Sequence, residues 1–268
     1  MKIIDYTKKF RLNNKIAFVV GGSGLIGREV VCALSEFGAK VIVLDIINKI
    51  KFSNNNSKIF FKYFNVAKLN QSEANLTKII KKYGAPEIFV NCSYPYNKKW
   101  FNSSFSEIKL KSITDNVNIH MNSYIWLARL AAENMKINKI CGTIIQLSSI
   151  YGLVGQNLSI YKNTKIKENL TYSAIKGGII SNTKLMASYY GKYKIRINCV
   201  CPGGLIGHFA GSTMSQTSTF KKKYSENVPL KRMGTPDEVA SAILFLSSDA
   251  SSYITGSTLT IDGGWTSI

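Results

Sequence analysis

The sequence has few residues that could bind a metal ion or carry thiol chemistry. It contains two histidines and five cysteines, with no CxxC pair. His120 and His208 fall in no recognisable metal or nucleophile spacing, and the odd number of cysteines, mostly in apolar segments, is typical of free thiols in a reducing compartment. We therefore expect no metal ion, no disulfide framework and no cysteine catalysis.

Acidic residues are also scarce, and long hydrophobic runs are missing. The chain has 35 Lys and Arg against 15 Asp and Glu, which gives a net charge of +20. Such a charge attracts nucleic acid, anionic membranes or anionic small molecules, or it is simply a lysine-rich surface, because the densest basic run is Lys221–Lys223. No run approaches the ~18 apolar residues of a membrane span, and the first residues lack the apolar core of a signal peptide. We expect a cytoplasmic protein that binds neither nucleic acid nor membranes.

The length and composition fit one cored domain. Hydrophobic residues make up 45% of the 268 residues, which is ordinary globular usage. A chain of this length buries roughly 70–75% of its unfolded surface without disulfides or metals. No composition break or internal repeat divides the chain, so we predict a single domain over residues 1–268.

Short apolar runs alternate with longer segments of helical periodicity. The expected strands are Ile16–Val20, Val41–Leu44, Ile59–Phe64, Ile88–Val90, Thr143–Leu147, Ile195–Val200 and Thr258–Ile261. The expected helices are Arg28–Phe37, Gln71–Tyr83, Asp115–Met135 and Tyr172–Tyr190. Unbroken apolar strands separated by helices are typical of a parallel sheet buried on both faces. We predict an α/β fold, a Rossmann-type three-layer sandwich with a mostly parallel seven-stranded sheet.

A glycine-rich turn follows the first expected strand. Residues 22–27, Gly-Ser-Gly-Leu-Ile-Gly, fit GxGxxG and open a helix, and Asp45 ends the next strand 18 residues after Gly27 (45−27). Such glycines let the backbone approach a pyrophosphate at the helix N-terminus. The Asp45 carboxylate would accept hydrogen bonds from adenosine ribose hydroxyls and repel a 2′-phosphate. The pattern predicts NAD as cofactor, with NADP as the alternative because Arg28 offsets part of this repulsion.

A tyrosine and a lysine form the second chemical signal. Tyr172 and Lys176 are four residues apart, so they share one face of the expected helix. A free phenol has a pKa of about 10 and is a poor base at neutral pH, but a nearby ammonium favours the phenolate. Ser148 and Ser149 end the fifth strand, and the carboxyl ends of parallel strands meet at one ligand-binding edge. The alternative is a chance pair on the surface of a lysine-rich helix.

Taken in order, these motifs resemble the short-chain dehydrogenase/reductase (SDR) family, in its single-domain branch. The resemblance covers about residues 13–265 and rests on motifs along the whole chain. They are the glycine turn, Asn91, Ser149, Tyr172-x-x-x-Lys176, Pro202-Gly203, Arg232-Met233-Gly234-Thr235-Pro236-Asp237-Glu238, Ile254-Thr255-Gly256 and Asp262-Gly263-Gly264.

The resemblance implies a role for each matching residue. Tyr172 would be the general acid/base, Ser149 would orient the substrate oxygen, and Lys176 would hold the nicotinamide ribose and lower the pKa of Tyr172. Asn118, between Asn116 and Asn122 in the long helix, would anchor a proton-relay water. The implied cofactor-binding residues are Gly21, Ser23, Gly24, Leu25, Ile26, Gly27, Asp45, Asn65, Val66, Asn91, Ser93, Tyr172, Lys176, Pro202 and Gly203.

The chain departs from the family pattern at the cofactor-side loop. Residues 91–94 read Asn-Cys-Ser-Tyr where Asn-Asn-Ala-Gly is usual, so a bulky Tyr94-Pro95-Tyr96 enters this loop. Asn65 replaces an Asp that usually touches adenine. Neither departure removes a catalytic group.

An insertion suggests the class of substrate. Ser149 and Tyr172 are 23 residues apart (172−149), which is more than the family usually has. The extra loop contains four candidate substrate-binding residues, Tyr161, Lys162, Lys165 and Lys167. A second basic segment after Gly203 reaches Lys221–Lys223. We expect substrate loops at residues 93–104, 150–171 and 203–228. Basic loops over one cleft favour an anionic substrate, unless they are solvated loops of a lysine-rich protein.

These features resemble a subgroup associated with bacterial surface-sugar and flagellin-glycan biosynthesis. That resemblance implies hydride transfer at a secondary alcohol of a phosphorylated or nucleotide-linked sugar. One alternative is reduction of a 3-oxoacyl group on an acidic carrier protein. Another is a non-catalytic dinucleotide-binding scaffold. The family also implies a homo-oligomer, a dimer or a tetramer.

Overall fold

Seven strands form one sheet in which every pairing is parallel. The computed structural model describes residues 4–48, 58–98, 100–162, 167–208 and 215–268. The strand order is β3-β2-β1-β4-β5-β6-β7. The strands are β1 (Ile16–Val20), β2 (Lys40–Asp45), β3 (Ile59–Tyr63), β4 (Ile88–Asn91), β5 (Thr143–Leu147), β6 (Arg196–Pro202) and β7 (Thr258–Ile261). The predicted α/β fold is confirmed, with a wholly parallel sheet. The chain reverses its direction of growth between β1 and β4, where ligands of such sheets bind.

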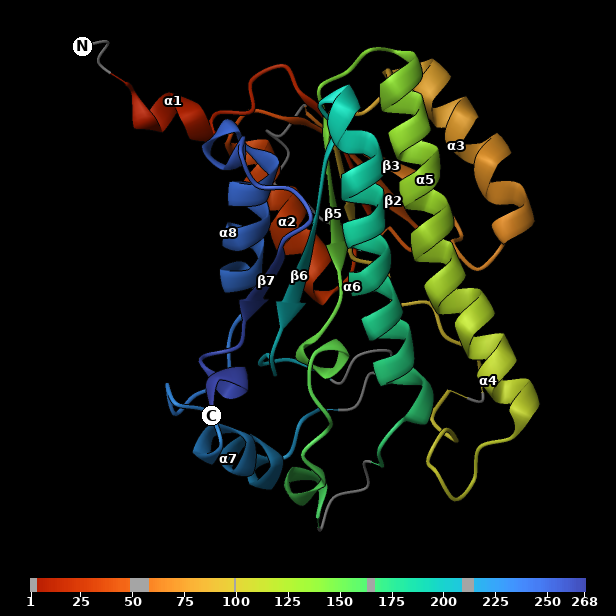
Figure 1. Ribbon diagram of the computed structural model, residues 1–268, viewed down its shortest axis with the longest axis vertical. Coiled ribbons are helices and arrows are strands. Elements are labelled where there is room, and N and C mark those ends of the chain that lie inside the picture. Colours follow the sequence, from red (N-terminus) through yellow and green to blue (C-terminus); the bar gives the residue numbers. More distant parts are fainter. Residues whose placement is uncertain (1–3, 49–57, 99, 163–166, 209–214) are drawn as a thin grey trace.

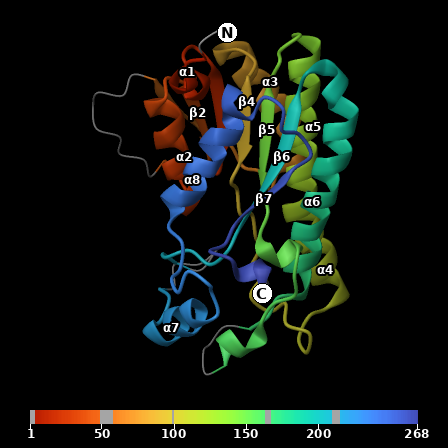
Figure 2. The same cartoon turned by 60° about the vertical axis from the view of Figure 1, so that its left-hand side comes forward.

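Helices cover both faces of the sheet. The helices are α1 (Tyr6–Phe10), α2 (Leu25–Glu36), α3 (Leu69–Tyr83), α4 (Leu110–Asn116), α5 (Asn122–Ile137), α6 (Leu170–Tyr190), α7 (Ser218–Glu226) and α8 (Pro236–Ser247). Helices α2 and α8 lie on one face and α3, α5 and α6 on the other, while α7 lies beyond the carboxyl ends of the strands (Figures 1 and 2). The carboxyl ends of the strands form the carboxyl edge of the sheet, which the helices on the two faces leave open.

The unbroken apolar strands fill two cores at once. Neighbouring residues of a strand point to opposite faces of the sheet. In β1, Val19 packs in the core that includes residues of α2 and α8, whereas Phe18 packs in the core beneath α3, α5 and α6. Both side chains are 0% exposed. This is why the strand sequences show no polar alternation.

The expected helix Asp115–Met135 is divided in three. Helix α4 ends at Asn116, a π-helical turn follows at Val117–Met121, and α5 begins at Asn122. A π-turn widens the helix by one residue, and such turns are frequent at functional sites. This turn packs against α6. Helices α1, α7 and α8 were not predicted from periodicity.

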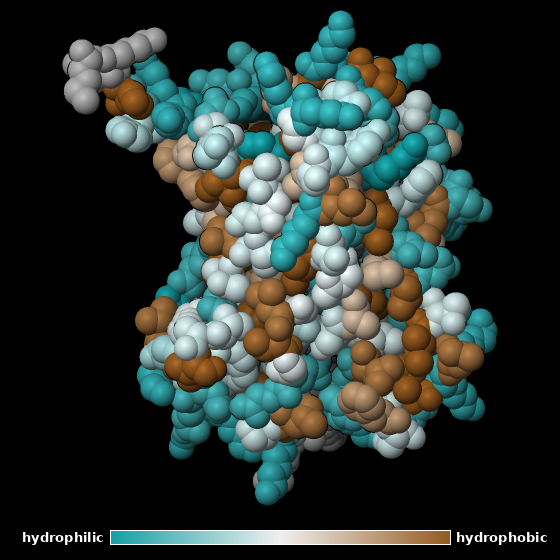
Figure 3. Space-filling model, viewed as in Figure 1, coloured by the Kyte–Doolittle hydropathy of each residue, from teal (hydrophilic) through white to brown (hydrophobic). Residues whose placement is uncertain are grey.

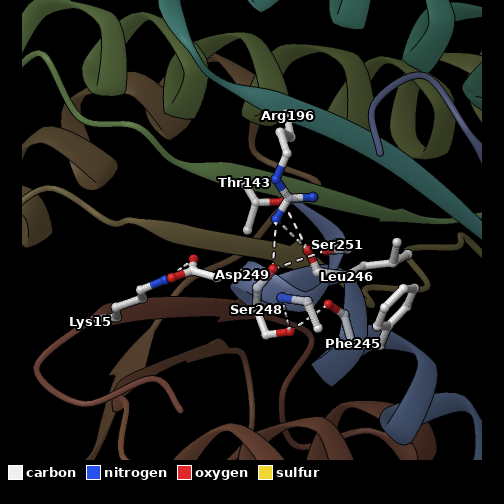
Figure 4. Close-up of polar contacts among 9 residues, drawn as sticks. Lys15, Thr143, Arg196, Phe245, Leu246, Ser248, Asp249 and Ser251 are labelled. Carbon is white, nitrogen blue, oxygen red and sulfur yellow. Dashed lines mark hydrogen bonds and ion pairs between the residues drawn. The ribbon is translucent and has the colours of Figure 1, made fainter. Parts of the chain in front are cut away.

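Hydrogen bonds fasten the amino edge of the sheet. Arg196, at the start of β6, donates to the carbonyl oxygen of Leu246 at 2.9 Å, in the last turn of α8, and to that of Ser248 at 3.2 Å, just past the helix (Figure 4). It also donates to the carbonyl of Ile254 at 3.2 Å. Lys15 forms an ion pair with Asp249 at 2.9 Å. These contacts tie the start of β6 and the residue before β1 to the end of α8 and the turn that follows it.

Across the described part of the chain, no helix combines the length and apolar character that crossing a membrane requires.

Candidate active site

The turn between β1 and α2 packs tightly against the end of β4. Gly21 has a φ of +72°, and a Cβ atom there would lie 2.6 Å from the Ser93 Cα. A Cβ on Gly27 would lie 2.1 Å from the Gly21 carbonyl oxygen. Among the described residues no side chain caps α2 at Gly24, so the N–H groups of its first turn remain available to an anion. The backbone therefore forms a cradle that only glycines permit.

Asp45 and Asn65 lie along the carboxyl ends of β2 and β3. Asp45 Oδ2 accepts a hydrogen bond from the Ser23 N–H at 3.0 Å, which places the carboxylate beside the glycine turn. The Ser23 hydroxyl is buried without a partner among the described residues. Asn65 Oδ1 accepts from the Ala67 N–H at 3.0 Å, and Val66 packs against the core.

Asn91 ends β4 at the centre of the same edge. Its Oδ1 accepts from the Ser93 N–H at 3.1 Å and from the Ser93 hydroxyl at 2.7 Å. Its Nδ2 is buried and has no hydrogen-bond partner within the described ranges. A glycine cradle, a carboxylate beside it and unpartnered polar atoms at the topological switch point all fit a dinucleotide.

Tyr172 and Lys176 lie on the first turns of α6. Lys176 is 1% exposed, and its Nζ donates to the Leu147 carbonyl at 3.0 Å and lies 5.6 Å from the Tyr172 ring centre. The structure separates the two candidate serines. Ser148 donates to the Lys176 carbonyl at 2.8 Å, whereas the Ser149 hydroxyl is hydrogen-bonded to Tyr172.

Burial changes the acidity of both groups. It raises the pKa of Tyr172 to about 12, with the Ser149 hydrogen bond acting in the opposite direction. It lowers the pKa of Lys176 to about 8. In the protein without a cofactor, burial of the phenol is the largest influence on the pKa of Tyr172, and the lowering of that pKa by Lys176 stays a prediction. Lys176 faces the flat side of the phenol ring, and removal of water from the hydroxyl dominates.

Aromatic side chains from two loops surround Tyr172. The ring centres of Tyr94, Trp100 and Tyr151 lie 6.2, 6.4 and 6.4 Å from that of Tyr172. The Tyr161 hydroxyl donates to the Tyr151 hydroxyl at 3.3 Å, and Tyr161 also stacks on a residue of α7, Phe220. Parts of two expected substrate loops thus meet around the phenol, and the third reaches them through the contact of Phe220 with Tyr161.

Comparison with known proteins identifies the family. A family profile described as enoyl-(acyl carrier protein) reductase matches residues 22–266. The chain belongs to the SDR family. Its members are NAD(P)-dependent oxidoreductases, as the sequence analysis expected.

Relatives within the SDR family differ in what their names describe. The chain is 29% identical to post-translational flagellin modification protein A of Campylobacter coli, over 95% of this chain and 99% of that protein. It is 32% identical to the 3-oxoacyl-[acyl-carrier-protein] reductase FabG of Chlamydia muridarum, over 94% and 98% of the two chains. It is also similar to the crystal structure of a short-chain dehydrogenase from Leptospira borgpetersenii with bound NAD+, with a TM-score of 0.84, 27% identity, and 99% and 97% of the two chains covered.

The structure does not bring Asn118 into the SDR site. Its side chain is exposed and accepts a hydrogen bond from Asn122 at 3.1 Å. Asn116 is buried, but it donates to the hydroxyls of Ser103 and Thr171 and so fastens α4 to α6. The buried polar side chain of this helix that reaches the aromatic cluster is His120, which the sequence analysis left without a role.

The helical spacing of residues in this segment could have identified His120 from the sequence. His120, Tyr124 and Leu127 follow a spacing of i, i+4 and i+7, and each is 0% exposed. Such a spacing marks one helix face. Asn118 and Asn122 lie on the opposite, exposed face.

The basic loop residues of this SDR protein are only partly placed over the site. Lys162 is exposed, and its carbonyl accepts a hydrogen bond from Lys223 of α7 at 2.6 Å. The Lys167 ammonium forms an ion pair with Glu107, which neutralises its charge. Lys165 lies outside the described residues.

Hydrogen bonds from backbone N–H groups fix the segment that follows β6. The Gly203 N–H donates to the Ile261 carbonyl at 2.9 Å, and the Gly204 N–H donates to the Tyr224 hydroxyl. Tyr224 stacks on Trp265 with ring centres 4.5 Å apart. Pro202 and Gly203 therefore end at the carboxyl edge, beneath α7.

Proposed function

We propose that this protein is an NAD-preferring SDR enzyme that interconverts a secondary alcohol and a ketone on a phosphorylated or nucleotide-linked sugar. The observation that carries the chemistry is the Ser149–Tyr172–Lys176 group at the carboxyl edge of the sheet, beside the glycine cradle. Bound NAD(P) supplies the hydride acceptor or donor. Tyr172 takes the hydroxyl proton of an alcohol, or returns it to a ketone oxygen, and Ser149 holds that oxygen by a hydrogen bond.

Lys176 has two tasks in this proposal. Its ammonium holds the nicotinamide ribose and favours the phenolate of Tyr172. Burial lowers the pKa of Lys176 to about 8, so the ammonium still predominates at neutral pH and can exchange its proton near the working range. Asn91 Nδ2, Gly21 and Ser93 would complete the cofactor contacts at the end of β4.

The preference for NAD rests on Asp45. Its carboxylate lies 3.0 Å from the Ser23 nitrogen, where it can accept hydrogen bonds from the two adenosine ribose hydroxyls. A 2′-phosphate would place a second negative charge beside it. Arg28 is exposed and pairs with Glu29 at 3.0 Å, which reduces its ability to offset this repulsion.

The proposed substrate class rests on charge and aromatic lining. Lys162, Lys221 and Lys222 are exposed on the loops around the site, and Tyr151 and Tyr161 present hydroxyls and ring faces near Tyr172. Tyrosines combine a flat apolar surface with a hydrogen-bonding tip, which suits a sugar ring. The similarity to a flagellin modification protein is consistent with this class.

Reduction of a 3-oxoacyl group on a carrier protein is the second candidate. The 32% identity to a 3-oxoacyl-[acyl-carrier-protein] reductase favours it, and an acidic carrier protein would also be attracted by a net charge of +20. The non-catalytic scaffold predicts binding without turnover. We consider it the weakest candidate because Ser149, Tyr172 and Lys176 are all retained.

One assay separates the three candidates. Purified protein is tested for NADH formation with NAD+ and a set of sugar phosphates and nucleotide sugars, and for NADPH consumption with an acetoacetyl thioester. The proposal predicts turnover in the first test and little in the second. Faster turnover in the second would favour the carrier-protein reductase, and cofactor binding without turnover in either would favour the scaffold.

We also propose that the protein is a homo-oligomer. Apolar side chains reach the surface on the lower right of Figure 3. Exposed apolar side chains of the helices include Leu110 of α4 and Leu185 and Tyr189 of α6. Exposed apolar surface of this kind commonly marks a protein contact. Light scattering at micromolar concentration should give a dimer or tetramer, and a monomer would contradict the proposal.

A further inference from the structure

His120 is buried on the π-helical turn between α4 and α5. The side chain is 0% exposed, and within the described residues neither ring nitrogen makes a hydrogen bond. Leaving a buried polar group without a hydrogen-bond partner lowers the stability of the fold. A phenylalanine ring could fill most of this volume without that cost. The presence of two ring nitrogens here therefore suggests that they have a function.

Aromatic contacts place His120 one ring away from the phenol of Tyr172. The imidazole packs edge-on against Tyr94, with ring centres 5.0 Å apart, and lies 5.6 Å from Trp100. Tyr94 and Trp100 both contact the Tyr172 ring, at 6.2 and 6.4 Å. His120 therefore lies behind the rings that line the reacting phenol.

Lys176 and His120 share the same aromatic neighbours. The Lys176 Nζ lies 5.1 Å from the ring centre of Tyr124 and 5.9 Å from that of Tyr94. Tyr124 in turn packs against His120 at 5.6 Å. The ammonium donates one hydrogen bond to the Leu147 carbonyl, and its other N–H groups face this cluster.

Electrostatics keep His120 uncharged. Burial, and then the positive charge of Lys176, hold the pKa of His120 well below its usual value. A neutral imidazole has one donor and one acceptor nitrogen. The ionisable groups around this cluster come from β4 and its following loop, α5, α6 and β6, and are Cys92, Tyr94, Tyr124, Tyr172, Lys176, Cys199 and Cys201. No described carboxylate contributes to the pKa shifts of His120 or Lys176.

We propose that His120 is a positioning residue for the Tyr172–Lys176 pair. Its neutral imidazole accepts a hydrogen bond from the Lys176 ammonium through one intervening water, and so stabilises the charged form of Lys176. The ammonium then favours the phenolate of Tyr172. In this role the imidazole stays neutral and acts only as an acceptor, so it orients Lys176 without taking part in the proton transfer.

This inference rests on the proposed acid–base role of Tyr172, and paired variants test it. His120→Phe keeps a ring between Tyr94, Trp100 and Tyr124 but removes both nitrogens. We expect its kcat to fall roughly ten-fold, which is less than the full contribution of an acid–base group, about 10²–10⁴-fold. The dissociation constant for NAD+ should stay at the wild-type value and the melting temperature should not fall, because the packing is retained. His120→Gln restores a donor and an acceptor and should recover part of the lost kcat.

The pH profile gives a readout that a packing role would not change. Without the acceptor, the charged form of Lys176 is less stable, so its pKa falls and the pKa of Tyr172 rises. The acidic limb of kcat for alcohol oxidation should therefore move to higher pH in His120→Phe, by about half a unit or more. An unchanged profile together with wild-type kcat would overturn the proposal.

Nuclear magnetic resonance supplies a test that does not depend on the substrate. The chain has two histidines, so ring-labelled protein gives two imidazole signals, and His208→Gln assigns them. The His120 ring should stay neutral from pH 5 to 8, by its environment, and its nitrogen shifts should respond to Lys176→Met. A His120 signal that titrates with an ordinary histidine pKa would overturn the proposal.

A matched Tyr172→Phe variant distinguishes the two possible failures. If Tyr172→Phe retains activity, the proposed function fails, and this inference fails with it. If Tyr172→Phe is inactive while His120→Phe and His120→Gln both keep wild-type kcat and pH profile, the proposed function stands and only the role of His120 is wrong.

Discussion

Polar groups at the amino edge of the sheet are hydrogen-bonded within the described chain, whereas several at its carboxyl edge are not. At the amino edge, Arg196 donates to three carbonyl oxygens and Lys15 pairs with Asp249 (Figure 4). At the carboxyl edge or beside it, buried polar atoms of four residues have no partner within the described chain. They are Ser23 Oγ, Asn91 Nδ2, both ring nitrogens of His120 and Gln146 Oε1. The two others found elsewhere are Asn182 Oδ1 and Thr258 Oγ1.

This difference separates stability from function. A satisfied buried network stabilises the fold, whereas an unsatisfied one costs free energy and calls for an explanation. Among the described residues, four of the six that carry unsatisfied buried atoms lie at or beside the edge where the glycine cradle, Asp45 and Tyr172 meet. We infer that the amino edge holds the sheet together and the carboxyl edge keeps hydrogen-bonding capacity for ligands.

The largest effect is expected from Tyr172→Phe at the carboxyl edge. The variant keeps the ring but removes the acid–base oxygen, so kcat should fall by about 10²–10⁴-fold while NAD+ binding is retained. Tyr190→Phe is the matched control, because this tyrosine lies on the same helix and its hydroxyl bonds to Glu133 at 2.8 Å, away from the site. More than about a tenth of the wild-type kcat in Tyr172→Phe would contradict the mechanism.

Arg196→Ala should have the opposite effect, with lower stability and unchanged catalysis. Removing the guanidinium takes one charged donor from each of the carbonyls of Leu246, Ser248 and Ile254, which keep hydrogen bonds from Thr143, Ser251 and Asn198, respectively. Hydrogen bonds to charged groups contribute about 1.5–3 kcal/mol each. We expect the free energy of unfolding to fall by about 2–3 kcal/mol in urea denaturation, with kcat and KM unchanged. The exposed Arg129→Ala serves as the control. A change in KM without a change in stability would remove the distinction between the two ends.

The carboxyl edge should also show a pH-dependent stability cost. The pKa of Lys176 is about 8 in the folded protein and lies higher in the unfolded chain. Between these values the unfolded state binds more protons, so the contribution of Lys176 to stability rises with pH above about 8, and its penalty is constant below. Urea denaturation of wild type and Lys176→Met should give a difference in unfolding free energy that changes between about pH 8 and pH 10. A constant difference would show that Lys176 is not desolvated.

Asp45→Ala should alter cofactor choice without affecting stability. We expect the ratio of NADP+ to NAD+ dissociation constants to fall by about ten-fold, because the carboxylate no longer repels the 2′-phosphate. Asp249→Ala at the amino edge is the matched carboxylate control, and its ratio should stay at the wild-type value. Calorimetric titration measures both. An unchanged ratio in Asp45→Ala would assign the preference to another group.

The smallest effect is expected from the lysine loop. Neutralising Lys162, Lys165 and Lys167 to Gln should raise KM for an anionic sugar several-fold and leave the NAD+ affinity unchanged. The Glu107 partner of Lys167 limits the effect, and added salt should raise the wild-type KM, since exposed charges are screened over about 8–10 Å. Gln at Lys78, Lys81 and Lys82, in the last turns of α3, is the control. An unchanged KM in the loop variant would make this loop a solvated insertion.

Much of the fold could be predicted because the strands are unambiguous. Ile16–Val20 and Thr143–Leu147 are unbroken apolar runs, and burial on both faces of a parallel sheet requires that pattern. Residues at strand ends, such as Asp45, Asn91 and Ser149, were predicted to share one edge for the same reason. Their positions relative to the glycine turn follow from topology alone.

The remaining features depend on contacts that are distant in the sequence. The ion pair of Lys167 with Glu107 joins residues 60 positions apart, so no local sequence pattern predicts it. The aromatic cluster of Tyr94, Trp100 and His120 assembles from a loop and a π-helical turn. Asn118 was chosen by its place in the chain, although the phase of the buried helix face points to His120.

The account's central claim is that the unsatisfied carboxyl edge is the NAD-binding and catalytic end. A crystal structure of the protein with NAD+ tests it most directly. We predict the pyrophosphate against the turn at Gly21–Gly27, the adenosine ribose hydroxyls on the Asp45 carboxylate, and the nicotinamide ribose beside Tyr172 and Lys176, with a partner gained by Asn91 Nδ2. NAD+ bound elsewhere, or bound there with Asn91 Nδ2 still unpartnered and the nicotinamide away from Tyr172, would contradict the account.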